Sequence, residues 1–524
     1  MRGLVSFGES NIEESREDDS ERLRYRRQFV LGPRPLAEFP SWQRIKIGDD
    51  VFLTAHPDLD TLQVFSNGKS LTLLGFILDP QNPGSDDSAI LAQLLPELCS
   101  DTGLNESLQS TNRFGGRWIL IADNGSRITL LSDALGQRQV YYTFRPIRGE
   151  VWCASQPGIV ADILNLKPSR DAIEFIAAQK SSGQEEYWFP GNTSLYDDVK
   201  LLLPNHYLDL THLESRRFWP CRSLAEIPLH EVVKNSATLI RGLMMSAANR
   251  FPLKILITAG WDSRVVLAAA MDLKTEVSYS TFVKGDSSST NPDVNVPARL
   301  LPKLGKIHEI LNIPDRMDPV FGQLYLQNVA AAHECYGPTA QALYGSTGPA
   351  EVRVSGGGSE TVRQQFRPSV RGSMTAEILA EFAHTTQKFA IEAFEVWLSG
   401  VPANMGFDVL DLFYWEQKCG QWLAAGQVEW DIAGESIAAF DCRTLLATLL
   451  SAHEDYRLPP DYELYRTLLK RLSPKVLSEP INPHKKLGAS ERSFRARVKR
   501  ALVKYHLREY LPAAVLNLAK KVVR

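Results

Sequence analysis

The sequence predicts an α/β protein in which a strand-rich region comes first and a parallel α/β region follows. Between 29 and about 210, short apolar runs have strand character, and Asn-Gly pairs at 67–68 and 124–125 separate such runs as β-hairpins require. After about 225, apolar runs alternate with helical patterns, which indicates βαβ units and a parallel sheet. The change of character falls at 215–233, where we expect a domain boundary.

Each region is predicted from its own patterns. In the first region, helical patterns at 87–99 and 170–180 interrupt strands at "VFLTAHP", "LQVFSNGKSLTLLGFILD", "RWILIADNGSRITLLSDALGQRQVYYTF", "EVWCAS" and "NHYLDL". In the second, we expect a helix at 229–249, the strand "KILIT", a helix at 262–272, the strand "EVSYSTF", a helix ending near Gly305 and the strand "KIHEIL". Residues 375–470 have a mostly helical pattern.

Length and composition limit the classes of protein. The chain of 524 residues is long enough for two or three domains, and its net charge of -3 gives no global attraction to nucleic acid. No apolar run of 18 residues occurs, so we expect a cytoplasmic protein. The six cysteines lie far apart and lack zinc-site spacing. We expect a mobile charged segment at 1–28, domains at 29–215 and 225–490, and a basic tail at 491–524.

The hexapeptide "TAGWDS" joins a predicted strand to a helix. Thr258, Ala259 and Gly260 are small, so their backbone amides can approach an anion at the start of the helix, where the dipole favours phosphate. Asp262 suits the Mg²⁺ that a nucleotide carries, and Ser263 follows it. No lysine follows as in a Walker A loop, which favours chemistry at the α-phosphate. The alternative is an ordinary strand–turn–helix connection with Asp262 and Ser263 as N-cap residues.

A second stretch, "VRVSGGGSETV" at 352–362, has the same order of strand, small-residue turn and helix. It carries Glu360 near the start of its helix. Two such loops on one parallel sheet can face a single nucleotide, because ligands bind beyond the carboxyl ends of the strands. Asp262 and Glu360 would then share the metal.

Together these stretches resemble the asparagine synthetase family, which includes β-lactam synthetase and the lasso-peptide cyclases. "TAGWDS" is similar to its S-G-G-x-D-S pyrophosphate loop and "SGGGSE" to its S-G-[EY]-G-[SA]-D loop. "STFVKGDSSSTNPDVNVPARLLPKLGKIHEI", with Asp293 and Ala298 in a D-x-x-x-x-A pattern, resembles the segment between them, and "AAFDCRTLLATLL" is a more distant form of the P-F-L-D stretch. Upstream, "RFGGRWILIADNGSRITLLSDALGQRQVYY" and "KLLLPNHYLDL" resemble parts of the glutaminase domain.

The resemblance implies a fold and a set of ligands. Residues 29–215 would form an Ntn-hydrolase type sandwich, and 225–490 would form an ATP-pyrophosphatase domain with a helical extension. ATP and Mg²⁺ would be the cofactors, with Asp262 and Glu360 on the metal. The positions implied for ATP or pyrophosphate are Thr258, Ala259, Gly260, Asp262, Ser263, Phe282, Ser355 and Gly356.

The chain departs from the family at several positions. A working glutaminase of the family uses an N-terminal cysteine, whereas Met1 is followed here by Arg2 and no cysteine occurs before Cys99, so we expect this domain to be inactive. Gly357 stands where the family has a Glu or Tyr that handles the amine, and Glu360 replaces an Asp. "EPINPHKKLGASER" resembles the region of the family's catalytic lysine, for which Lys486 is preferred over Lys485. The alternative is that both are solvated loop lysines.

The implied activity is ATP-dependent, AMP-forming amide ligation: a carboxylate is adenylated, and an amine or ammonia then displaces AMP. The same chemistry would serve a macrolactam or peptide cyclase. A tRNA-modifying enzyme would need a catalytic cysteine pair or a nucleic-acid-binding module, and the sequence has neither. A third alternative is a non-catalytic or membrane-docked scaffold with a peptide or protein partner in a biosynthetic complex.

The tail at 491–524 has ten Lys and Arg against two acids, and its apolar residues keep helical spacing. It would contact an anionic membrane or a partner, or it would pack on its own domain.

Overall fold

A computed structural model describes residues 20–483, apart from 101–102, 146, 148, 286–290, 349, 364–365, 367–373 and 404. Residues Met1–Glu479 form one compact unit and Pro480–Arg524 a second, and all of the described helices and strands belong to the first. The predicted tail and both candidate lysines, Lys485 and Lys486, lie outside the described residues. Within the described ranges, every helix is too short or too polar to cross a bilayer.

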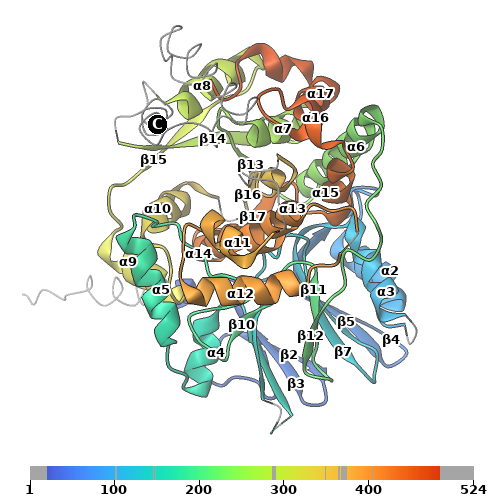
Figure 1. Cartoon of the computed structure of the whole chain (residues 1–524), viewed down its shortest axis with the longest axis vertical. Coiled ribbons are helices and arrows are strands. Elements are labelled where there is room, and N and C mark those ends of the chain that lie inside the picture. The colour runs from blue at the N-terminus through green and yellow to red at the C-terminus, as the bar shows by residue number, and fades with distance from the viewer. Residues whose placement is uncertain are drawn as a thin grey trace, which may run out of the picture. The chain divides into compact units, whose positions relative to one another are not determined.

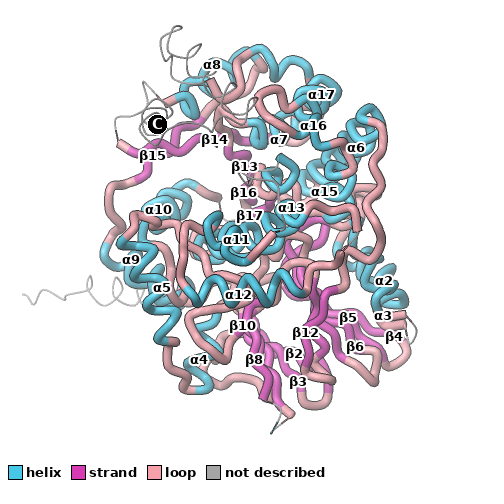
Figure 2. Tube along the Cα trace, in the orientation of Figure 1, coloured by secondary structure: helices cyan, strands magenta, loops and turns pink. Residues whose placement is uncertain are grey.

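The strand-rich half contains two antiparallel sheets, shown in magenta in Figure 2. The first has the order β10 (Lys200–Leu201), β8 (Tyr141–Arg145), β9 (Glu150–Ala154), β1 (Phe29–Gly32), β3 (Val51–Ala55) and β2 (Gln43–Gly48). The second has the order β12 (Glu214–Arg217), β11 (His206–Asp209), β7 (Ile128–Ser132), β6 (Gly115–Asp123), β5 (Lys69–Leu78) and β4 (Thr61–Ser66). Helices of this half are α2 (Asp87–Leu98), α3 (Leu104–Gln109), η1 (Ser110–Arg113), α4 (Pro157–Leu164) and α5 (Arg170–Ser181).

The two antiparallel sheets pack face to face. Their shared core takes Leu31 and Leu53 from the first sheet and Leu74, Ile119 and Leu130 from the second, all fully buried. Helix α4 packs on β8 and β9, while α2 packs on β4 and β5, so helices cover the outer faces. This layering is the sandwich that the fold-class prediction expects, because the inner faces of the two sheets bury their apolar side chains against each other.

The predicted hairpins are confirmed. β4 and β5 pair antiparallel around Asn67 and Gly68, whose φ angles are 51° and 74°. Both central residues of a tight hairpin turn need positive φ, which Asn and Gly tolerate. β6 and β7 pair around Asn124 and Gly125, and the Asn124 side chain accepts the Ser126 amide at 3.0 Å.

The prediction of a mobile segment up to residue 28 is wrong for its last nine residues. Residues 20–23 are helical, and Leu23, Arg26 and Arg27 are buried. Arg26 pairs with Asp58 at 2.7 Å and donates to the Ile432 carbonyl at 3.0 Å. These partners are distant in the sequence, so the charged composition of the segment does not reveal them. They offset the free-energy cost of burying the arginine side chains.

The second half is built on a parallel sheet, as predicted. Its order is β15 (Glu309–Ile313), β14 (Val277–Lys284), β13 (Leu253–Leu256), β16 (Val352–Ser355) and β17 (Ser436–Ala438). β13 therefore lies at the centre (Figure 1). β17 interrupts the region 375–470, which the sequence pattern predicts to be mostly helical; its three residues are too few to give a periodic signal.

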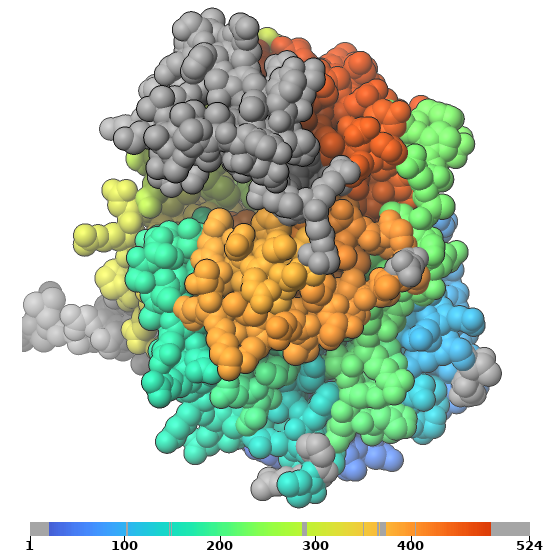
Figure 3. Space-filling model, viewed as in Figure 1, coloured from blue at the N-terminus to red at the C-terminus, as the bar shows by residue number. Residues whose placement is uncertain are grey.

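Helices fill the rest of this half. Those in the first part are α6 (Leu229–Ala248), α7 (Trp261–Ala270), α8 (Pro292–Lys303), α9 (Pro319–Asn328), η4 (Glu334–Tyr336), α10 (Gly337–Ser346) and η5 (Ser359–Arg363). Those that follow are α11 (Ala376–Phe382), α12 (Lys388–Ser399), α13 (Val409–Phe413), the π-helix η6 (Tyr414–Leu423), α14 (Ala424–Trp430), α15 (Arg443–Leu450), α16 (Glu454–Arg457), α17 (Glu463–Leu472) and η7 (Pro474–Ser478). Figure 3 shows the orange part of this helical region at the centre of one face, beside the teal segment that includes α5.

Candidate functional site

The two small-residue loops follow adjacent strands at the centre of the parallel sheet. The loop 257–260 follows β13, and the loop 356–358 follows β16, its parallel neighbour. The chain leaves β13 towards β14 on one side and β16 towards β17 on the other, so the strand order reverses between these two strands. A ligand crevice is expected at such a switch point.

The amides of the first loop are already partly engaged. The Thr258 N–H donates to Ser263 Oγ at 3.1 Å, and the Gly260 N–H donates to Thr258 Oγ1 at 3.2 Å. The Ala259 N–H donates to Asp293 Oδ1 at 2.9 Å, which ties the start of α8 to the loop. The loop is thus ordered by the side chains that the sequence places in and near the motif.

Helix α7 begins without a side-chain cap. Gly260 is its N-cap residue, with no side-chain hydrogen bond to the helix amides, and Asp262 and Ser263 lie in the first turn. The alternative that Asp262 and Ser263 act as N-cap residues is therefore wrong. An uncapped N-terminus of a ten-residue helix leaves backbone donors for an anion, which is the arrangement that phosphate sites use.

Gly356 brings the second loop against the first. A Cβ atom on Gly356 would lie 2.7 Å from the Asp262 carbonyl carbon and 3.0 Å from the Ser263 nitrogen. Only a residue without a side chain permits this approach of two backbones. Within the second loop the Gly357 N–H donates to Ser355 Oγ at 3.3 Å. The sequence pattern predicts a helix after this loop. The element found there is a 3-10 helix of five residues rather than an α-helix.

Asp262 and Glu360 share a cation. Arg363 Nη2 lies 2.5 Å from Asp262 Oδ2 and 3.6 Å from Glu360 Oε1. Asp262 Oδ1 is buried and has no hydrogen-bond partner among the described residues, and the same is true of Arg363 Nε. The structure therefore brings the two predicted metal ligands together, with an arginine beside them that sequence reasoning missed. Its i,i+3 spacing from Glu360 was the available signal.

The electrostatics of this pair favour an added cation. Burial and, second, the neighbouring Asp262 raise the pKa of the Glu360 carboxyl to about 8, against the opposing effect of Arg363. Burial also raises the pKa of Asp262 against the effect of Arg363. One guanidinium does not fully compensate two half-buried carboxylates.

The residues at the two loops fit a Mg²⁺ ion bound with a phosphate. Mg²⁺ in nucleotide sites takes one or two carboxylates, with phosphate and water completing its shell. Asp262 and Glu360 supply two carboxylates, and the orphaned Asp262 Oδ1 is an available ligand atom. No cluster of three or more His, Cys, Asp or Glu side chains with metal-site geometry occurs among the described residues.

Phe282, the remaining predicted site residue, lies on the strand next to β13. It is half-buried on β14, in register with Leu311 on β15. Tyr465 on α17 is a further residue that the motifs did not reveal: its hydroxyl lies 2.7 Å from Ser359 Oγ and donates to the Ser359 carbonyl at 2.8 Å. It fixes the start of η5, which carries Glu360.

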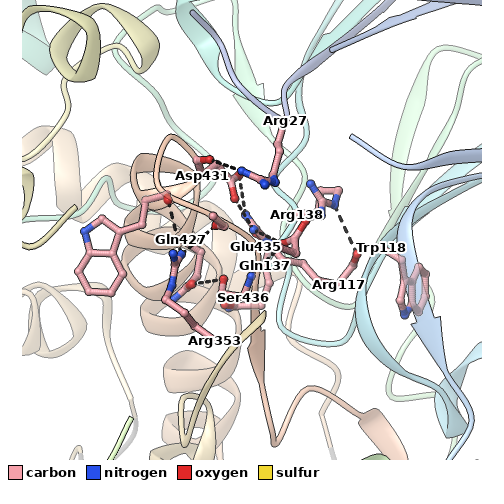
Figure 4. A network of polar contacts seen from close by, with 12 residues as sticks. Arg27, Arg117, Trp118, Gln137, Arg138, Arg353, Gln427, Asp431, Glu435 and Ser436 are labelled. Carbon is pink, nitrogen blue, oxygen red and sulfur yellow. Dashed lines mark hydrogen bonds and ion pairs between the residues drawn. The ribbon is translucent and has the colours of Figure 1, made fainter. Parts of the chain in front are cut away.

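A buried network of charges connects the two halves beneath β16 and β17 (Figure 4). Arg117 on β6 pairs with Asp431 at 2.5 Å and with Glu435 at 2.8 Å, and Arg138 pairs with Glu435 at 2.7 Å. Arg27 donates to the Asp431 carbonyl at 2.8 Å. Arg353, on the strand that leads to the second loop, donates to the Gly434 carbonyl at 2.9 Å. The strand-rich half thereby sets the position of the strand that presents the second loop.

Comparisons with known proteins complete this description. No family model matches the chain, and no curated protein matches its sequence. Two solved structures are similar over much of their length: the glutamine phosphoribosylpyrophosphate amidotransferase from B. subtilis in complex with ADP and GMP, at 12% identity over 66% of this chain and 73% of that chain with a TM-score of 0.21, and a protein described as the allosteric regulatory enzyme of purine biosynthesis, at 12% identity over 60% and 75% with a TM-score of 0.22. These low values carry no conclusion about activity.

Proposed function

We propose that this protein is an ATP-dependent, AMP-forming amide ligase of the asparagine synthetase kind, without glutaminase activity of its own. The observation that carries the proposal is the convergence of Asp262 and Glu360 on one cation at the switch point of a parallel sheet. Carboxylates from two loops, next to an uncapped helix N-terminus, suit a nucleotide with its metal.

The roles of the residues follow from their positions. Asp262 and Glu360 would hold Mg²⁺, which when bound neutralises phosphate charge. The first turn of α7 would receive pyrophosphate oxygens, and Gly356 lets the second loop lie directly against the backbone of Asp262 and Ser263. Arg363, which pairs with both carboxylates, would be available to phosphate oxygens if a metal ion displaced it. Lys486, or Lys485, would supply further positive charge at the reacting carboxylate.

The amine does not come from glutamine in this proposal. Burial raises the pKa of the Cys99 thiol to about 11 and that of Cys442 to about 12, and it also raises those of Cys153 and Cys419. Thiols in such surroundings are poor nucleophiles at neutral pH. In this proposal ammonia, or an amine already present on the substrate, attacks the activated carboxylate.

A specific observation favours a second candidate, a non-catalytic scaffold with a peptide or protein partner. Arg363 already pairs with the carboxylates, and the amides of Thr258, Ala259 and Gly260 already have partners within the chain. A loop that satisfies its own donors gains less from binding a phosphate.

Pyrophosphate release tests the proposal. The full chain is incubated with ATP, Mg²⁺ and a panel of carboxylates, with and without ammonium, and is compared with Asp262→Asn. Asp272→Asn is the matched control, because Asp272 follows the other end of α7 and its side chain is 72% exposed. Release with one carboxylate that Asp262→Asn loses and Asp272→Asn retains supports the ligase. If no carboxylate supports release and ATP shows no binding by calorimetry, the scaffold replaces it.

A further inference from the structure

A cavity of about 590 Å³ lies between the end of α5, the end of α11 and the π-helix η6. Its walls include the aromatic side chains of Tyr187, Trp188, Phe382 and Tyr414. Tyr187 and Trp188 are buried at 4% and 7% exposure, so the rings are held in place rather than displayed. This volume falls within the range of pockets that bind small molecules.

Lys418 is the cation of this cavity. Its ammonium lies 4.0 Å from the ring centre of Trp422 and 5.8 Å from that of Trp188. Within the described chain it makes no hydrogen bond or ion pair, although it is half-buried. Burial lowers the pKa of Lys418 to about 8, against the opposing effect of Glu186. A half-buried ammonium without an anionic partner is costly unless a ligand supplies one.

Hydrogen bonds behind the wall fix its shape. His333 bonds to the Tyr187 carbonyl at 2.7 Å through Nε2 and to Glu429 at 2.6 Å through Nδ1. Tyr336 donates to Glu186 at 3.0 Å and receives the indole N–H of Trp422 at 2.7 Å. The cavity is therefore preorganised by side chains from both halves of the chain, which favours a binding role over a chance void.

The cavity lies next to the carboxylate site. Tyr414 and Lys418 are on η6, and the following residue, Cys419, lies 3.7 Å from the Thr361 hydroxyl, adjacent to Glu360 in sequence. Leu423 of the same helix is the side chain that a Cβ on Gly357 would meet at 3.0 Å. Runs of π-helix are rare and frequently occur at functional sites. One face of η6 thus serves the cavity while another packs on the second loop.

Charged groups of both signs line the cavity. Glu185 and Glu186 line it and are exposed, whereas Lys418 is half-buried. A ligand carboxylate would pair with the ammonium inside, and a ligand ammonium would lie near the two glutamates at the opening. The aromatic residues that line the cavity, such as Tyr187 and Trp188, suit an apolar or aromatic side chain of the ligand.

We propose that this cavity binds the carboxylate substrate, and that the substrate is an amino acid or short peptide with an apolar or aromatic side chain, its carboxylate on Lys418 and its amino group towards Glu185 and Glu186. As a statement about the substrate of the ligase, the inference rests on the proposed function. As a statement about binding, it is testable without ATP.

Calorimetry with three matched ligands tests the binding. L-phenylalanyl-L-phenylalanine carries both charged ends, its C-terminal amide lacks the carboxylate, and its N-acetyl derivative lacks the ammonium. We expect the dipeptide to bind the full chain roughly ten- to a hundred-fold more tightly than the amide, the range of a charge-assisted hydrogen bond. Lys418→Met removes this preference and Lys418→Arg retains it. Glu185→Gln with Glu186→Gln removes the preference for the free amine over the acetylated ligand.

The outcomes separate the inference from the proposed function. Absence of binding by all three ligands overturns the inference, as does an unchanged preference for the carboxylate in Lys418→Met with unaltered thermal unfolding. Asp262→Asn should leave dipeptide binding as it is. Dipeptide binding without ATP-dependent pyrophosphate release would support the binding role of the cavity and contradict the ligase activity. Pyrophosphate release without dipeptide binding would support the ligase activity and contradict the binding role of the cavity.

Discussion

Asp262 and Arg363, 101 residues apart in sequence, form a part-buried ion pair with Nη2 and Oδ2 2.5 Å apart. Arg363 also lies 3.6 Å from Glu360, so a single guanidinium occupies the place between the two carboxylates. A metal ion bound there would have to share or replace this cation. The arginine is therefore the residue through which metal binding and local stability are coupled.

Replacing Arg363 should make stability depend on Mg²⁺. Arg363→Met leaves two half-buried carboxylates uncompensated, and we expect a loss of roughly 2 kcal/mol in the free energy of unfolding without metal. Mg²⁺ should restore more stability to this variant than to the wild type, because the ion supplies the missing charge. Thermal unfolding with Mg²⁺ and with chelator measures the difference. Arg363→Lys keeps the charge and serves as the control; equal responses of wild type and Arg363→Met would show that the carboxylates do not bind metal.

Gly356→Ala should destabilise the protein. The added methyl group would lie 2.7 Å from the Asp262 carbonyl carbon, which is backbone and cannot turn aside. We expect a loss of about 1–3 kcal/mol in urea unfolding, the usual cost of overpacking. Gly345→Ala is the matched control, since its Cβ meets nothing within 4 Å and it lies inside α10. That change should be neutral or stabilising; similar losses at both positions would contradict the close contact of the two loops.

The buried network around Glu435 should govern acid stability. Burial alone would raise the pKa of Glu435, but Arg138 and Arg117 outweigh burial and hold the pKa below its ordinary value of 4.5. A carboxyl whose pKa is lower in the folded protein than in the unfolded chain stabilises the fold at any pH above its unfolded pKa. That contribution is lost progressively as the pH falls below 4.5.

We therefore expect Glu435→Gln to lower the free energy of unfolding by roughly 3 kcal/mol at pH 7 and to flatten its decrease between about pH 5 and pH 3. Urea unfolding across this range measures both effects. Glu276→Gln, at an exposed position, is the control. An acid profile of Glu435→Gln that parallels the wild type would exclude Glu435 as its source.

Thiol chemistry should be confined to Cys221. This side chain is exposed, whereas Cys99, Cys153, Cys419 and Cys442 are buried free thiols, and burial raises the pKa of the half-buried Cys335 to about 11. Iodoacetamide at neutral pH should label Cys221 first in the native protein, as peptide mass spectrometry would show, and glutamine should not be hydrolysed to glutamate. Glutamate release that iodoacetamide abolishes would overturn the assignment of an inactive glutaminase domain.

The sequence by itself determined the parts of this protein whose causes are local. Asn67 and Gly68 provide the positive φ angles of a hairpin, and the small residues before α7 and after β16 predict two loops at strand ends, because turn conformation and hydrophobic period depend on neighbouring residues. Asp262 and Glu360 could be paired from sequence alone because parallel strands end at one edge of a sheet.

Only the tertiary structure decided which groups complete the site. Arg363 reaches Asp262, and Lys418 approaches the ring of Trp188 in a cavity that Tyr187 also lines, through contacts that no local pattern encodes. The burial of Arg27 in a segment with a disordered composition depends likewise on the Asp431 carbonyl, 404 residues away. Such partners are fixed by the packing of the sandwich on the parallel sheet, since the cost of burying a charge is met by whatever group the fold places beside it.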